Sequence, residues 1–270
     1  MIQIHCAVEQ PEMIALEKII SEAEGFKTFV FKGQLNAKPG QFVMVWIPGV
    51  EMKPFSISYQ DEHKFHITVM EVGEFTKAMF ALHEGDYVGI QGPYGRPFTM
   101  NEGKSVVIVG GGCGIAPVNF LAYDAVSRGK EVCFIGGCRN KNVFIKAAEI
   151  KALPVEAIFT TDDGSFGEKG FTTNALEKIM QERSVDQIFA CGPEKMLHAV
   201  ATMAVAREIS CQISVERMMK CAIGICGQCC LDDTGVRVCR EGPVFEAKTL
   251  LNSKEFGSYK RDNRGAVCNL

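Results

Sequence analysis

The sequence predicts a multi-domain β plus α/β protein with three parts: an antiparallel β-barrel, a doubly wound parallel sheet, and a small C-terminal domain built around cysteines. Three observations indicate this class. β-type runs dominate residues 1–103, apolar runs alternate with helical segments over residues 104–214, and six of the 12 cysteines lie within residues 215–270. A chain of 270 residues is long enough for two or three domains, so these ranges are the predicted domains.

Composition and charge exclude several classes of protein. With 47% hydrophobic and 23% charged residues, the chain is not collagen-like, wholly disordered or embedded in a membrane. Its net charge of -3 supplies no positive field that would attract nucleic acid or an anionic membrane. The uncharged stretch 105–123 contains several glycines and Pro117, which predicts a strand, a turn and a helix and no membrane span. Residues 1–14 lack the features of a secretory signal, so we expect a cytoplasmic protein.

The barrel is predicted from short β-type runs that are separated by turn residues such as Lys38-Pro39-Gly40. Close spacing of such runs is typical of an antiparallel barrel or sandwich. One amphipathic helical segment, residues 76–83, interrupts them. The predicted strands are residues 25–33, 41–48, 55–60, 64–70 and 86–92.

The parallel sheet is predicted from a change of period after residue 103. Apolar runs here are continuous and do not alternate with polar residues, which is typical of strands covered by helices on both faces. The predicted strands are residues 105–111, 131–137, 155–161, 186–192 and 211–215. The predicted helices are residues 117–127, 142–151, 172–182 and 193–207.

The cysteines near the C-terminus carry the strongest functional signal. Three of them have C-x4-C-x2-C spacing and a fourth follows, which is typical of plant-type [2Fe-2S] ligation. Gly224 and Gly227 allow the loop to wrap closely enough for backbone N–H groups to point at sulfur. The predicted metal ligands are Cys221, Cys226, Cys229 and Cys239.

Other interpretations of the cysteines stay open at this point. Four thiolates also suit Zn²⁺, although zinc sites usually show two C-x2-C pairs and this sequence has one. Cys230 could replace Cys229 if the loop shifted by one residue, and four buried thiols without metal would have to fall at this spacing by chance. Outside this segment we interpret the scattered cysteines as small buried hydrophobic residues. They are Cys6, Cys113, Cys133, Cys138, Cys191 and Cys211.

A glycine-rich turn, GGGCGIAP at residues 110–117, lies between a predicted strand and a predicted helix. Glycines there let the backbone approach a phosphate at the helix N-terminus, where N–H groups favour anions. A tight turn without a ligand is the alternative, and Pro117 breaks the simple G-x-G-x-x-G pattern. The candidate phosphate-binding residues are Gly110, Gly111, Gly112 and Gly114.

CGPEKM is a second anchor of the sheet domain. It places Cys191, Gly192 and Pro193 at the carboxyl end of a strand, the edge at which doubly wound sheets bind ligands, although spacing alone favours a merely buried thiol at Cys191. Two barrel motifs are individually weak. KPFSIS (residues 53–58) and GEFT (residues 73–76) fit an exposed Lys-Pro turn and a helix N-cap. Together they place a cation, two hydroxyls and a helix start in one small barrel.

These motifs, in this order, resemble those of the ferredoxin-NADP reductase superfamily over essentially the whole chain. The resemblance is carried by KPFSIS, GEFT, GPYG (residues 92–95), GGGCGIAP and CGPEKM. Within that superfamily the cysteine spacing followed by CREGPVF (residues 239–245) is similar to the electron-transfer subunits of dihydroorotate dehydrogenase B.

The resemblance implies a flavin-binding barrel, an NAD(P)-binding sheet and a [2Fe-2S] domain. It implies FAD, and a catalytic partner subunit with FMN that oxidises dihydroorotate in pyrimidine biosynthesis, in a heterotetramer. Electrons would pass from that FMN through the cluster and the FAD to NAD⁺.

The resemblance also implies roles for single residues. Ser56 would lie near flavin N5 and Cys191 beside the nicotinamide, as the two catalytic residues. Lys53 and Thr76 would lie near the flavin pyrophosphate. Pro54, Phe55 and Gly73 would complete the flavin site, and Gly192 and Pro193 would join the glycine-rich turn in binding NAD(P).

Some departures and alternatives remain. Lys53 stands where the motif usually has arginine, so a bidentate phosphate clamp is replaced by a point charge. The short gap before Cys239 suggests a trimmed hairpin over the cluster. Arg139 and Lys141 could hold a 2′-phosphate of NADP or be solvated loop charges.

Two other functions stay open. The chain could be the small subunit of a ferredoxin-dependent NADP reductase or of a sulfur- or hydrogen-metabolising complex. It could also be a zinc-stabilised binding module without flavin. Ile223, Ile225, Val244 and Phe245 are expected to face the partner or to pack over the cluster, and residues 252–270 to form a surface tail without catalytic duty.

Overall fold

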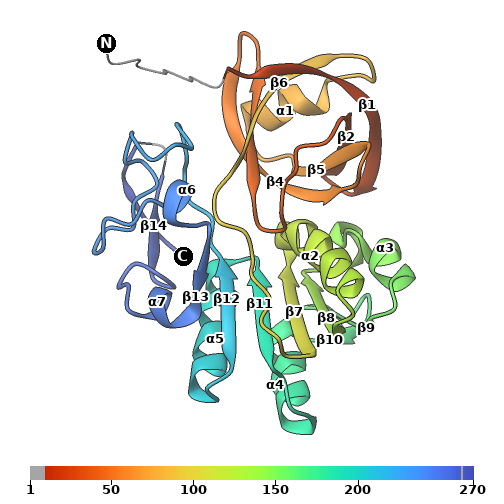
Figure 1. Ribbon diagram of the computed structural model, residues 1–270, viewed down its shortest axis with the longest axis vertical. Helices are drawn as coiled ribbons and strands as arrows, with labels where there is room; N and C mark the ends of the chain where they lie inside the picture. Colours follow the sequence, from red (N-terminus) through yellow and green to blue (C-terminus); the bar gives the residue numbers. More distant parts are fainter. Residues whose placement is uncertain (1–9, 263) are drawn as a thin grey trace.

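A computed structural model describes residues 10–262 and 264–270, and it confirms the predicted fold class (Figure 1). The barrel lies at one end of the molecule, above a parallel sheet with its helices, and the C-terminal segment lies beside both (Figure 1). No helix in these ranges is both long enough and apolar enough to cross a membrane. Cys6 lies outside the described residues.

Six antiparallel strands close the barrel in the order β1-β2-β5-β4-β3-β6. Buried aromatic side chains such as Phe29, Phe31 and Phe65 fill its interior. A short helix, α1 (Glu74–Phe80), follows the fifth strand. The strands are β1 (Glu12–Ala23), β2 (Phe26–Lys32), β3 (Phe42–Ile47), β4 (Glu51–Gln60), β5 (Lys64–Met70) and β6 (Tyr87–Tyr94).

The long first strand, β1, is absent from the predicted set of strands. Its sequence, EMIALEKIISEA, is rich in residues that favour helices, and Leu16 is its one fully buried side chain. Pairing with β2 and β6 decides its conformation, so tertiary contacts override the local preference.

The second sheet has the order β10-β9-β8-β7-β11-β12-β13. Its strands from β10 to β12 run parallel, as predicted. The strands are β7 (Ser105–Gly111), β8 (Glu131–Cys138), β9 (Glu156–Thr161), β10 (Glu168–Lys169), β11 (Gln187–Cys191), β12 (Ser210–Ser214) and β13 (Val244–Glu246).

Helices cover both faces of this sheet. Helices α2 (Ile115–Ser127) and α3 (Ala147–Ala152) share one apolar cluster with the sheet, whereas α4 (Thr172–Glu182) and α5 (Glu194–Ala206) share another. The prediction of one helix over residues 142–151 was wrong in its extent, because α3 begins only at Ala147. A 3-10 turn, Lys141–Val143, is separated from α3 by Lys146, whose φ of 60° is left-handed and breaks the helix.

The cysteine-rich segment is joined to the sheet. Its strand β13 pairs antiparallel with β12, and α7 (Ala247–Leu251) packs against α5 (Figure 1). A four-residue helix, α6 (Val238–Glu241), precedes β13, and a hairpin of β14 (Tyr259–Arg261) and β15 (Val267–Asn269) ends the chain. The segment expected to be a surface tail therefore has strand structure of its own.

A buried cation joins the barrel to the sheet domain. Lys146 is 4% exposed, and its ammonium contacts Glu22 of β1 and donates to Glu149 of α3 at 2.7 Å. The side chain of Asn119, on α2, donates to Glu149 at 3.1 Å and to the backbone carbonyl of Ser58 at 3.4 Å. These contacts hold β4, which carries the KPFSIS motif, against α2, and the two elements lie side by side in Figure 1.

A histidine lies next to this cation. His66, on β5, packs its ring against Tyr59 at 4.9 Å between centroids. Burial lowers the pKa of His66 from 6.5 to about 4, and the positive charges of Lys146 and Lys64 act in the same direction. The imidazole is therefore neutral in the folded protein near pH 7.

Removing the buried cation should destabilise the fold. Lys146→Met leaves Glu22 and Glu149 without their partner, and we expect a loss of about 3 kcal/mol in the free energy of unfolding, measured by urea denaturation. Lys178→Met, at an exposed position of α4, is the matched control and should change that free energy by less than about 0.5 kcal/mol. Equal effects of the two changes would contradict the importance of this contact.

His66 should make stability depend on pH. Its folded pKa is lower than its unfolded pKa, so its contribution is complete above about pH 6.5 and is lost as the pH falls towards about 4. We expect His66→Phe to flatten the decline of the free energy of unfolding in this window, measured by denaturation at several pH values. An unchanged decline would show that other groups cause it.

Candidate cofactor and electron-transfer site

The first four residues of the KPFSIS motif, residues 53–56, lie on the half of β4 that pairs with β3. Residues 51–56 pair with β3, whereas the described pairing with β5 runs from Ile57 to Gln60. Pro54 has no N–H to donate, so it suits a stretch with one open edge. Lys53, Pro54, Phe55 and Ser56 therefore lie where β4 diverges from β5, and all four are half-buried.

The two barrel motifs meet at this edge. The rings of Phe55 and Phe75 stack with centroids 5.7 Å apart, which brings KPFSIS and GEFT together. The hydroxyl of Thr76 donates to the carbonyl of Gly73 at 2.9 Å and accepts from the N–H groups of Gly73 and Val72. Thr76 therefore shapes the turn that begins α1, and its hydroxyl is already in use there.

The cation of the first motif has an acidic neighbour. The ammonium of Lys53 lies 2.6 Å from the carboxylate of Glu51, and the two side chains are 33% and 55% exposed. Glu51 offsets part of the charge that Lys53 would present to a phosphate. Ser56 lies opposite Phe42 of β3 and is half-buried.

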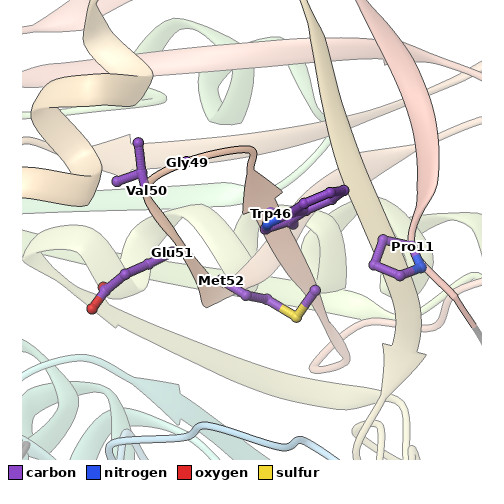
Figure 2. A pocket seen from close by; sticks show the side chains of 6 residues that line it. All are labelled: Pro11, Trp46, Gly49, Val50, Glu51 and Met52. Atoms are coloured by element: carbon purple, nitrogen blue, oxygen red, sulfur yellow. The ribbon is translucent and has the colours of Figure 1, made fainter.

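A hollow of about 430 Å³ lies on the neighbouring hairpin between β3 and β4. Figure 2 shows Trp46 between Pro11 and Met52, with Glu51 pointing away from them. The hollow is mostly apolar and contains none of the predicted site residues, although Glu51 in its lining contacts Lys53 of the motif. Its lining is Pro11, Trp46, Gly49, Val50, Glu51 and Met52.

The glycine-rich turn packs directly against the CGPEKM motif. A Cβ added at Gly114 would lie 2.3 Å from the carbonyl oxygen of Cys191, and one at Gly111 would lie 2.6 Å from the sulfur of Met196. Gly110 is similarly crowded by Val118 of α2. Three of the four glycines are therefore required for close packing of the turn.

Gly112 differs from the other glycines of the turn. Its φ is +53° and no atom would lie within 4 Å of an added Cβ, so open space faces its backbone. It is the position of the turn at which a ligand could approach the chain closely.

A second hollow, of about 290 Å³, lies where these two motifs meet the C-terminal hairpin. Cys113 and Gly192 contribute from the turns, and Lys260 and Leu270 contribute from the chain end. The last residues therefore form part of this wall, which their polar sequence gave no reason to expect. The remaining lining residues are Pro193, Glu194, Lys195, Leu197 and Glu216.

The thiol of Cys191 is held in its protonated form. Burial raises its pKa to about 12, and the neighbouring Cys113 acts in the same direction. Cys191 is therefore a small neutral group at the strand end. Of the other scattered cysteines, Cys133, Cys138 and Cys211 are buried as interpreted, whereas the interpretation was wrong for Cys113, which is exposed.

The four predicted cluster ligands form two pairs. The backbone N–H of Cys226 points at the sulfur of Cys221, with N and S 3.5 Å apart. The N–H of Cys239 points at the sulfur of Cys229, with N and S 3.3 Å apart. Within the described residues no three Cys, His, Asp or Glu side chains surround one metal ion.

Backbone donors change the acidity of the first thiol. Burial acts to raise the pKa of Cys221, but N–H groups of Cys226, Ile225 and Ile223 outweigh it and lower the pKa to about 6. Stabilised thiolate at Cys221 suits a cluster held by thiolates, whereas burial raises the pKa of Cys239 to about 12. Two pairs of sulfurs also suit two irons, each with two protein ligands.

The loop distinguishes Cys229 from Cys230. Cys229 is buried and its sulfur accepts a hydrogen bond from within the ligand set. Cys230 is half-buried. The geometry therefore favours Cys229 as the third ligand.

An arginine that the motifs do not include also lies in this region. Arg217 forms buried ion pairs with Glu194 and Glu255, which are 23 and 38 positions away along the chain. These residues are far apart in the sequence and form no local pattern, so the contact could not be predicted from the sequence.

Two family models match the chain. The iron-sulfur cluster binding domain of dihydroorotate dehydrogenase B matches residues 216–251, and the oxidoreductase NAD-binding domain matches residues 108–202. Together with the fold, these matches fit FAD, a [2Fe-2S] cluster and NAD.

Among solved structures, that of an NADH-dependent reduced ferredoxin-NADP oxidoreductase is similar. It has a TM-score of 0.80 and 28% identity, and the match covers 88% of this chain and 89% of the other. Phthalate dioxygenase reductase, at 18% identity and a TM-score of 0.58, shares the fold, with coverage of 73% and 63%.

Two curated relatives that are similar over almost the whole chain share one name. The probable dihydroorotate dehydrogenase B (NAD(+)), electron transfer subunit, of Methanocaldococcus jannaschii is 43% identical, with coverage of 96% of this chain and 98% of the relative. The protein of the same name from Pyrococcus furiosus is 42% identical, with coverage of 94% and 97%. The chain therefore belongs to the family of dihydroorotate dehydrogenase B electron transfer subunits.

Proposed function

We propose that this chain accepts electrons from a catalytic partner that oxidises dihydroorotate and delivers them to NAD⁺. The observation that carries the proposal is the presence, in one chain, of a thiol loop with backbone N–H donors and of an oxidoreductase NAD-binding domain. The names of the relatives support the substrate and the nucleotide. Arg139 and Lys141 are exposed, as solvated loop charges would be.

The family resemblance suggests which residues would hold each group. The open edge of β4 and the turn before α1 would hold the flavin through Lys53, Pro54, Phe55, Ser56, Gly73 and Thr76. The turns at the sheet edge would hold NAD through Gly112, Cys191, Gly192 and Pro193, and close packing at Gly110, Gly111 and Gly114 would shape the turn behind it. The thiol loop would hold the cluster through Cys221, Cys226, Cys229 and Cys239.

Nicotinamide exchanges two electrons together as hydride, whereas an iron-sulfur cluster exchanges one electron at a time. A bound flavin would convert between the two modes. The work of the protein is to fix distances. The Phe55–Phe75 stack orients the two flavin motifs, and the contact of Gly114 with Cys191 fixes the nucleotide turns. Cys191 is protonated, so it would contact a nicotinamide without attacking it.

The partner would carry FMN, in a heterotetramer, and would dock beside the thiol loop. Ile223 and Ile225 are 48% and 79% exposed there, next to Cys221. Val244 and Phe245, expected alongside them, pack into the sheet edge and the core. The exposed pair therefore offers an apolar contact where electrons must enter.

The alternative of a small subunit of a ferredoxin-dependent NADP reductase is not favoured. Its structural counterpart is 28% identical, whereas the relatives named dihydroorotate dehydrogenase B reach 44%. Cytoplasmic location stays a prediction.

The first test separates the chain from its partner. The isolated chain should oxidise NADH with ferricyanide and show flavin bands with a broad iron-sulfur shoulder. NAD⁺ should be reduced at the expense of dihydroorotate only after an FMN-containing catalytic subunit is added. Dihydroorotate oxidation by the chain alone would contradict the proposal, and a colourless preparation containing zinc would favour the binding module.

The second test concerns the docking surface. Ile225→Glu places a charge in the expected contact and should weaken assembly with the catalytic subunit at least about 10-fold, measured by titration calorimetry. Val72→Glu changes a side chain that is 71% exposed on the barrel and should leave assembly unchanged. NADH oxidation by each isolated variant should match that of the parent chain. Equal affinities of the two variants would place the contact elsewhere.

A further inference from the structure

Arg217 is the centre of a buried three-residue contact. It is 6% exposed and lies between β12 and the thiol loop. Its two terminal nitrogens donate to the carboxylate of Glu194 at 2.7 and 2.9 Å, and its Nε donates to Glu255 at 2.6 Å. Glu255 is 1% exposed, so water hardly reaches it.

Each carboxylate leads to a different part of the molecule. Glu194 is the first residue of α5 and directly follows Gly192 and Pro193; it also lines the hollow beside Cys113. Its Oε1 accepts a further hydrogen bond from the N–H of Gly257 at 3.2 Å. One side of Arg217 therefore holds the turn that would contact nicotinamide.

The other carboxylate leads to the thiol loop. One oxygen of Glu255 accepts from Arg217 and the other accepts from the backbone N–H of Asp232 at 2.8 Å. Asp232 closely follows Cys229 and Cys230 in the chain. The other side of Arg217 therefore holds the backbone that leaves the cluster loop.

The chemistry of the contact favours a role in geometry. Well-packed apolar residues often stabilise a buried site as well as ions do, whereas charged groups fix direction through their hydrogen bonds. Guanidinium is planar and uses a separate edge for each carboxylate, so the angle between them is set. Lysine cannot reproduce this arrangement.

We propose that Arg217 is a positioning residue that fixes the turn at Gly192 relative to the thiol loop at Asp232. It acts through Glu194 on the nucleotide side and through Glu255 on the cluster side. The inference rests on the proposed function, since it assigns nicotinamide to the first side and [2Fe-2S] to the second.

The test uses three variants of the full chain loaded with its cofactors. Glu194→Gln keeps shape and loses charge on the nucleotide side, and it should raise the KM for NADH about 5-fold without altering the low-temperature EPR signal of the reduced cluster. Glu255→Gln should shift that signal and leave the KM within about 2-fold of the parent. Arg217→Lys should change both, because it loses the fork that serves both carboxylates.

Arg183→Lys is the matched control, because its ion pair with Glu156 is on the surface. It should change neither readout. Thermal unfolding of every variant is measured alongside, and Glu194→Gln and Glu255→Gln keep the test valid if Arg217→Lys does not fold.

Two results would overturn the proposal. Lower unfolding midpoints with unchanged KM and EPR signal would mean that the contact is structural only. Changes in both readouts for each glutamine variant would mean that the two sides are not separable. Failure of the proposed function is recognised separately, because the parent chain itself would then lack the EPR signal or NADH oxidation.

Discussion

Two buried cations hold three parts of this molecule together. Lys146 joins the barrel to the parallel sheet, and Arg217 joins the sheet to the thiol loop. A charge removed from water must keep its partners close, so each cation fixes the distance between the elements that supply them. Electron transfer needs that constancy, because a shift of one part would change the separation of the groups.

The fold was predictable where the local sequence pattern favours the same conformation as the tertiary contacts do. Continuous apolar strands such as residues 105–111 and 131–137 indicate a parallel sheet, and that sheet is present. β1 was missed because its helix-favouring sequence buries Leu16 alone, and the helix over residues 142–151 failed because Lys146 turns inward to Glu22. In both cases a contact distant in sequence decides the local conformation.

The candidate site was also predictable only in part. Spacing identified the thiol loop, because ligand geometry demands nearby cysteines and glycines in sequence. The roles of single residues in the motifs could not be predicted from the sequence. Three glycines of GGGCG are needed for close packing, and the hydroxyl of Thr76 forms hydrogen bonds within its own turn. Contacts such as the ion pairs of Arg217 cannot be predicted from a local sequence pattern, because the residues come from separate elements.

The pairing of β13 with β12 has a consequence for behaviour in concentrated solution. The seven-stranded sheet ends at one rim in β10, of two residues, and at the other in β13, of three residues. Rims this short offer few free peptide groups to a neighbouring molecule, so they are poor templates for intermolecular β-pairing. The segment recruited for redox chemistry thereby also shields the sheet against self-association.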